Sequence, residues 1–96
     1  QGAAAARAVA HAMLATIKAS LGSLDRVKRV VKVLGFVNST PDFLTHPAVM
    51  NGFSNAMIEV YGEAGRAARS AIGTSILPHN VPVEVEAVLE LHPSDP

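Results

Sequence analysis

Hydrophobic and polar residues alternate most regularly in the last third of the chain. From residue 83 to 91 every second position is apolar, while Glu84, Glu86, Glu90 and His92 fall on the other side of the strand. The preceding run "ARSAIGTSI" also has strand character, and "LPHN" joins the two. We therefore predict two C-terminal strands, the last with its apolar face in the core. Its expected core positions are Val83, Val85, Ala87, Leu89 and Leu91.

Two earlier segments have the apolar spacing of amphipathic helices. The alanine-rich start carries an apolar residue at every fourth position and ends at Gly22. A second helix is predicted from about His46 to Gly62, with Gly62 and Gly65 as left-handed stops. The expected core positions are Val9, Met13, Ile17 and Leu21 in the first helix, and Val49, Phe53, Met57 and Val60 or Tyr61 in the second.

Between the two helices, "LDRVKRVVKVLGFVNS" is dense in valine and predicts a strand. Its two faces are not cleanly segregated, which leaves open that both are covered, and its basic residues Lys28, Arg29 and Lys32 mark a solvated start. The order helix, strand, helix, strand, strand predicts a single α+β domain over residues 1–96, with two helices on one face of the sheet. Because such a sheet is thin and the chain starts on a helix, we expect further sequence upstream.

Composition narrows the classes of function. Eight Lys and Arg balance eight Asp and Glu, so there is no basic face for a nucleic acid. No run of about 18 apolar residues predicts a membrane span. The absence of cysteine fits a cytoplasmic protein, and 96 residues form only a small core, which favours an oligomer.

Common catalytic and nucleotide-binding motifs are absent, and the four histidines lack metal-ligand spacing. We expect no metal and no cofactor. The remaining candidate chemistry is Arg69 together with Glu84 or Glu86. The pair is either a cross-strand ion pair on the surface or a carboxylate-binding arginine that faces a proton-handling acid.

The stretch "ARSAIGTSILPHNVPVEVE" resembles the C-terminal signature of the reactive-intermediate deaminase (RidA or YjgF, endoribonuclease L-PSP-like) family. "LDRVKRVVKVLGFVNSTPDF" is similar to a strand and turn of that family, and residues 50–65 resemble its longer, less characterised subgroup. The resemblance covers about residues 5 to 92. It implies a chorismate-mutase-like fold, a homotrimer with clefts between subunits, and an N-terminal hairpin that is missing here, so that residues 1–96 form the C-terminal part of such a domain.

The resemblance also implies an activity, the hydrolytic deamination of enamines and imines such as 2-aminoacrylate and 2-iminopropionate to 2-oxo acids and ammonia. Arg69 would hold the substrate carboxylate and Glu84 would be the acid, with Glu86 as the competing candidate. Asn51 and the backbone carbonyl of Ala71 would contact the substrate, although the best-known members carry cysteine where Ala71 stands. The alternatives are a non-catalytic trimer that binds small carboxylates and, less favoured, an endoribonuclease. Arg66 is expected to be merely solvated.

Overall fold

A computed structural model describes residues 1–93, and its elements follow the predicted order. Three short 3-10 turns lie between the helices and strands, at Leu24–Arg26, Gly62–Gly65 and Pro78–Asn80. The principal elements are α1 (Gly2–Leu21), β1 (Val27–Asn38), α2 (His46–Tyr61), β2 (Ala68–Thr74) and β3 (Val83–Leu91). None of the helices in the described residues is long and apolar enough to cross a membrane.

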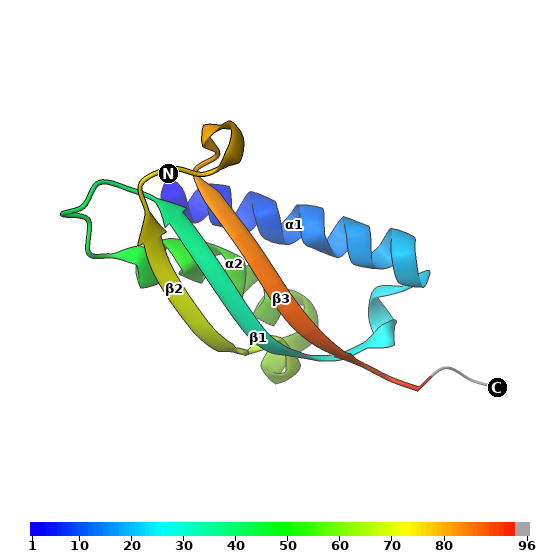
Figure 1. Ribbon diagram of the computed structural model, residues 1–96. Coiled ribbons are helices and arrows are strands. Elements are labelled where there is room, and N and C mark those ends of the chain that lie inside the picture. Colours follow the sequence, from blue (N-terminus) through cyan, green and yellow to red (C-terminus); the bar gives the residue numbers. More distant parts are fainter. Residues whose placement is uncertain (94–96) are drawn as a thin grey trace.

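The three strands form one sheet in the order β2-β1-β3 (Figure 1). Strands β1 and β2 run parallel and are joined through α2, whereas β1 and β3 run antiparallel. Although β2 and β3 follow each other in the sequence, β1 lies between them. The segment at "LPHN" therefore carries the chain across the end of the sheet and does not form a hairpin.

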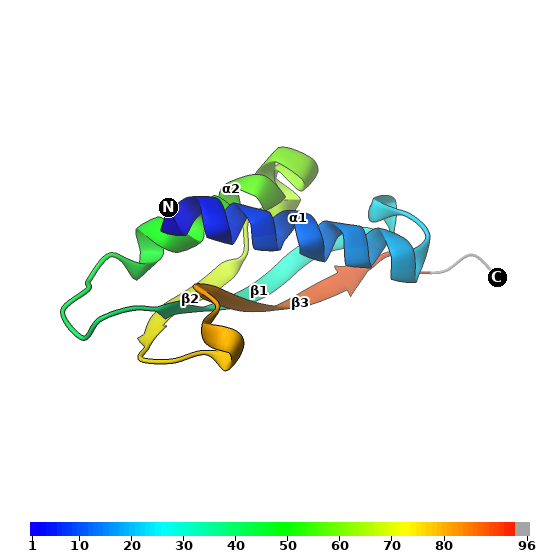
Figure 2. The same ribbon diagram turned by 90° about the horizontal axis from the view of Figure 1, so that it is seen from above.

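Both helices lie on the same face of the sheet, as predicted (Figure 2). Val30, Val33 and Val37 of β1 are 5% exposed or less and pack against the helices. On α2, Met50 lies over Gly35, where an added Cβ would overlap the methionine side chain. Hydrophobic contact between the valines and the helices holds the two layers together.

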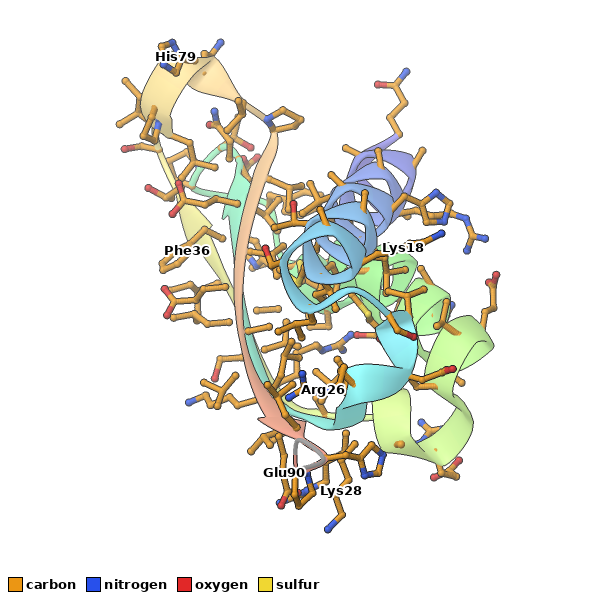
Figure 3. The ribbon with its side chains drawn as sticks, turned by 90° about the vertical axis from the view of Figure 1, so that its right-hand side faces the viewer. Lys18, Arg26, Lys28, Phe36, His79 and Glu90 are labelled. Atoms are coloured by element: carbon orange, nitrogen blue, oxygen red, sulfur yellow. The ribbon has the colours of Figure 1, made fainter. Side chains whose placement is uncertain are left out.

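The other face of the sheet is not covered by any part of the described chain, so within residues 1–93 only one face of β1 is covered. Lys32, Leu34 and Phe36 alternate with the buried valines, and Phe36 projects away from the helices (Figure 3). On the flanking strands, Ile72 is 46% exposed and Val88 is 58% exposed. We call this the open face of the sheet.

The predicted stripe of α1 is displaced by one position along the helix surface. Ile17 is buried as predicted, but Val9, Met13 and Leu21 are only partly buried. The other buried residues are Ala6, Ala10 and Leu14. The reason is the close approach of α2, whose Gly52 lies so near the backbone of Ala3 that a Cβ there would collide with it. Small side chains on the facing surfaces allow this approach, and larger apolar residues lie beside it.

Both helices end at the predicted glycines, but only Gly22 is a left-handed stop. Gly22 has a φ of 84° and donates its N–H to Lys18 O, whereas Gly62 combines a positive φ of 61° with a ψ of −139°, which is not the left-handed helical conformation. Gly65 does not have a positive φ; it is buried where a Cβ would collide with the Met57 carbonyl. Close packing therefore requires this glycine.

Of the two alternatives at the end of α2, Tyr61 is the inward residue. Its hydroxyl donates to Leu24 O at 3.1 Å, whereas Val60 is 45% exposed. Burial of the ring raises the pKa of the Tyr61 hydroxyl.

Strand β3 confirms the alternation up to Leu89, whose apolar neighbours at 83, 85 and 87 also pack against the core. Leu91 is still in register with the buried Val27, but it is 38% exposed at the end of the strand. There Arg29 Nε donates to Glu90 at 2.7 Å. Lys28 Nζ lies 3.9 Å from the same carboxylate at this end of the sheet (Figure 3). These basic residues form the solvated start of β1 that the sequence predicts.

Candidate functional site

Arg69 lies on the edge strand β2, and its side chain extends toward α2. It is paired in register with Val33 of β1, which places both residues on the helix side of the sheet. One guanidinium nitrogen, Nη1, donates to Asn51 Oδ1 at 2.8 Å and to Ser54 Oγ at 3.1 Å. Within residues 1–93 no hydrogen bond occupies Nε or Nη2. The arginine is therefore held from one side and keeps donors for a ligand.

The structure brings Arg69 and Asn51 together, as the resemblance implies, and adds Ser54. The serine lies three residues after Asn51 and so on the same surface of α2. That spacing was the available signal for it in the sequence. Ala71 follows Arg69 by two positions on the same side of β2, opposite Gly35. Within residues 1–93 no strand pairs with the outer edge of β2, so part of its backbone is open to other groups.

Glu84 lies on the other side of the sheet. In the register with β1, Glu84 is opposite Phe36 and Glu86 is opposite Leu34, so both carboxylates point to the open face. Strand β1 separates them from Arg69. The cross-strand ion pair weighed for Arg69 and Glu84 is wrong, because the two strands are not neighbours. Within one chain the proposed anchor and the proposed acid do not meet.

The other charges of this region pair locally. Arg66 lies 3.4 Å from Glu63 with both side chains mostly exposed, which agrees with its expected solvated role. Glu59 instead accepts two 2.7 Å hydrogen bonds from Arg7 of α1. These bonds hold the pKa of the Glu59 carboxyl below its ordinary value. Glu59 and Glu63 therefore each pair with a different arginine.

A cavity of about 390 Å³ lies where the parallel strands β1 and β2 end and α2 begins. Its position is one where open parallel sheets commonly bind ligands. Sequence reasoning missed it, although a glycine inside a strand, Gly73, signals close approach of another group. Among residues 1–93 no cluster of three His, Asp or Glu side chains could hold a metal ion. The lining residues are Ser39, Thr40, Pro41, Phe43, His46, Gly73, Thr74 and Ser75.

Comparison with known families decides the evolutionary relationship. The model of the family described as "YjgF/chorismate mutase-like, putative endoribonuclease" matches residues 1–91. The chain belongs to this family. Its mixed sheet with two helices on one face is the YjgF/chorismate mutase-like fold expected from the sequence.

Individual proteins are similar to the chain over nearly its whole length. "Protein TCP17" from Trypanosoma cruzi is 50% identical over 93 residues, which are 96% of this chain and 58% of that protein. A crystal structure of a protein of unknown function from Agrobacterium tumefaciens is 43% identical, with a TM-score of 0.90 over 96% of this chain and 62% of that one. A "putative endoribonuclease" from Shewanella oneidensis is 31% identical, with a TM-score of 0.88 over 94% and 60%. The chain thus spans about three fifths of the length of these relatives.

Proposed function

We propose that this YjgF-family protein hydrolyses reactive 2-imino acids and their enamine tautomers, of the 2-iminopropionate and 2-aminoacrylate type, to 2-oxo acids and ammonia in the cytoplasm. The proposal is based on the hydrogen bonds of the Arg69 side chain. Asn51 and Ser54 hold one of its nitrogens on an exposed surface, and Nε and Nη2 remain as donors. A guanidinium prepared in this way binds a carboxylate with two parallel hydrogen bonds.

The reaction needs few groups besides this anchor. Water adds to the carbon of the protonated C=N bond and gives up one proton to an acid–base residue, which leaves a neutral carbinolamine. The residue returns that proton to the nitrogen, the C–N bond breaks, and the hydroxyl proton passes to the departing ammonia, so that the 2-oxo acid and ammonium leave. An acid–base residue beside the carbon promotes the first two proton transfers. The backbone of Ala71, next along the same side of β2, is placed to contact the reacting carbon or the water.

We further propose that Glu84 of a neighbouring copy supplies the acid. Glu84 and Arg69 lie on opposite sides of one sheet, so they share a site only if the β2 edge of one copy meets the open face of another. The half-buried Leu34 and Phe36, together with Ile72, provide apolar surface for that contact. Two different surfaces then form the interface, and a contact of this kind gives a ring when its rotation closes and an open filament when it does not. A homotrimer with clefts between subunits meets this requirement.

The experiment compares three variants of the full-length protein. An amino-acid oxidase generates 2-iminopropionate in situ, and calorimetry measures pyruvate binding. Arg69→Lys should lose tenfold or more in kcat/KM and bind pyruvate weakly, because an ammonium does not reproduce the two parallel bonds. Glu84→Gln should lose turnover but still bind pyruvate. The matched control is Arg66→Lys, since Arg66 is exposed and pairs only with Glu63. Wild-type turnover in Arg69→Lys would overturn the proposal.

The same arginine geometry also suits a second candidate, a non-catalytic trimer that binds small carboxylates. In that case wild-type protein would bind pyruvate through Arg69 without hydrolysing any imine, and Glu84→Gln would change neither result. The endoribonuclease activity in the names of the family and of the Shewanella relative is the least supported candidate. A net charge of zero offers little attraction for an RNA backbone.

A further inference from the structure

One wall of the cavity at the carboxyl ends of β1 and β2 is formed by a hydrogen-bonded pair of polar side chains. Ser39 Oγ lies 3.2 Å from His46 Nε2, and both residues are partly buried. The Ser39 hydroxyl also donates to Val37 O at 3.2 Å. A hydroxyl has one proton, so with that proton on Val37 the imidazole donates to Ser39 through Nε2. Ser39 Oγ then retains a lone pair with which it accepts a further hydrogen bond.

The imidazole of His46 is fixed on two sides. The Phe43 ring meets it edge-on, with centroids 5.1 Å apart. Gly73 of β2 lies directly below it: a Cβ on this residue would stand 2.5 Å from His46 Nε2 and 2.9 Å from Ser39 Oγ. The serine and the imidazole therefore occupy space that only a glycine leaves free. Their arrangement depends on three separate segments of the chain.

The lining contains four hydroxyl residues and one imidazole but no Lys, Arg, Asp or Glu. A fully charged group buried here would lack an opposite charge, and such burial is unfavourable. An uncharged group with a hydrogen-bonding end is better matched, and Phe43 supplies an apolar surface for the rest of it. The volume of about 390 Å³ is sufficient for a ring-sized group.

Arg69 and the cavity lie along the same side of strand β2. Arg69, Ala71 and Gly73 follow each other on the helix side of β2. Four residues of strand separate the backbones of Arg69 and Gly73 by about 13 Å. A 2-imino acid that carries a para-hydroxylated aromatic side chain, with a hydrogen bond of about 3 Å at each end, is of comparable length.

We infer that the Ser39–His46 cavity is a side-chain specificity pocket, which selects 2-imino acids whose long, uncharged side chain ends in a hydroxyl or similar hydrogen-bonding group. The inference rests on the proposed function, because it takes Arg69 as the carboxylate anchor. Ser39 and His46 bind the distal end of the substrate and take no part in bond breaking. Gly73 is a positioning residue, because its lack of a side chain leaves space for Ser39 and His46.

The test uses three imines made in situ from alanine, phenylalanine and tyrosine, with the full-length protein. Phenylalanine and tyrosine differ by one hydroxyl, so their ratio isolates the predicted hydrogen bond. Wild-type kcat/KM should favour the tyrosine imine over the phenylalanine imine by about tenfold, the effect of one net hydrogen bond. Ser39→Ala and His46→Phe should abolish this preference and leave 2-iminopropionate hydrolysis unchanged. Equal wild-type rates for the two aromatic imines would overturn the inference.

Gly73→Ala provides an independent variant, because its methyl group displaces the His46 ring without touching Arg69. It should reduce the preference for the tyrosine imine as much as His46→Phe does. Ser20→Ala, at an exposed position near the end of α1, is the matched control and should behave as wild type. An equal loss for all three imines in Gly73→Ala would contradict a pocket that acts only on the side chain.

Binding of the product-like 2-oxo acids separates the two proposals. Calorimetry with pyruvate, phenylpyruvate and 4-hydroxyphenylpyruvate needs no turnover. If no imine is hydrolysed but 4-hydroxyphenylpyruvate binds about tenfold tighter than phenylpyruvate, in a manner that depends on Ser39, the pocket stands and the catalytic proposal fails. If 2-iminopropionate is hydrolysed but the two aromatic acids bind equally, the pocket fails and the catalytic proposal stands.

Discussion

Arg69 Nη1 donates to Asn51 Oδ1 at 2.8 Å, and this bond joins the edge strand β2 to the helix that precedes it. Ser54, one turn further along α2, accepts a second bond from the same nitrogen. A free arginine side chain loses about 2 kcal/mol of rotamer entropy when it is fixed. The two contacts meet part of that cost before any ligand arrives, which favours binding.

Asn51→Ala should therefore weaken ligand binding more than it weakens the fold. We expect the Kd for pyruvate and the KM for 2-iminopropionate to rise about three- to tenfold, with the free energy of unfolding changed by less than about 0.5 kcal/mol. Calorimetry and denaturant unfolding measure the two effects. Asn55→Ala, at an exposed position on the same helix, is the matched control.

Asn51→Asp gives a sharper test of the positioning role. A carboxylate at this position keeps the guanidinium in place but competes with the substrate for its charge, so binding should be weaker than in Asn51→Ala. A merely structural asparagine would give the opposite order, because aspartate resembles it in shape more than alanine does. Wild-type pyruvate affinity in both variants would exclude Asn51 from the site.

Mixing two inactive variants tests whether the site lies between copies. In a ring in which each site takes Arg69 from one copy and Glu84 from the next, an equal random mixture of Arg69→Lys and Glu84→Gln restores both residues in about one quarter of the sites. Coexpression of the two variants should therefore recover about a quarter of wild-type turnover. A site within one chain would recover none, and no recovery from confirmed mixed oligomers would refute the shared site.

The placement of Glu84 shows what a strand pattern specifies. Alternation along residues 83–91 correctly predicts that the glutamates face away from the core. Period-two spacing does not say which strand is the neighbour, and the parallel crossover through α2 puts β1 between β2 and β3. The same crossover brings His46 to Gly73, two residues 27 positions apart, and no local pattern encodes that contact.

The helices illustrate the same point at the level of packing. Spacing correctly predicts α2 from His46 and its core residues Val49, Phe53 and Met57. For α1 it favours the larger apolar residues, whereas the structure buries Ala6 and Ala10. In an alanine-rich helix, the face that meets a close neighbour is chosen by small size as well as by hydrophobicity. The neighbour is known only from the fold.

Gly35 is expected to be essential for packing between β1 and α2. An alanine methyl group here would overlap the Met50 side chain, which is fully buried. Gly35→Ala should destabilise the protein by about 1 to 3 kcal/mol, as overpacked cores do. The measurement is the denaturant midpoint at constant m-value.

A second substitution separates overpacking from other effects of alanine at Gly35. Met50→Val removes atoms from the region of overlap, so the double variant should be more stable than the sum of the single effects predicts. Strict additivity would show that Met50 does not cause the loss. The backbone of Gly35 does not have a positive φ, so strain from that source does not enter.

The Arg7–Glu59 pair should make the packing of α1 on α2 depend on pH. Two 2.7 Å hydrogen bonds from the guanidinium lower the pKa of Glu59, while Arg7 stays charged throughout. A carboxyl whose pKa is lower in the folded state contributes stability above its unfolded pKa of about 4.3 and loses that contribution as the pH falls through the folded value. Glu59→Gln should thus lower the Tm near neutral pH by a small amount, because both side chains are exposed. The deficit should disappear in acid below the folded pKa.

Glu63→Gln, whose partner Arg66 lies at 3.4 Å in the adjoining segment, is the control and should show a smaller deficit at neutral pH. A Tm deficit of equal size at neutral and acid pH would assign the role of Glu59 to side-chain packing, because packing, unlike the ion pair, does not depend on the carboxyl charge.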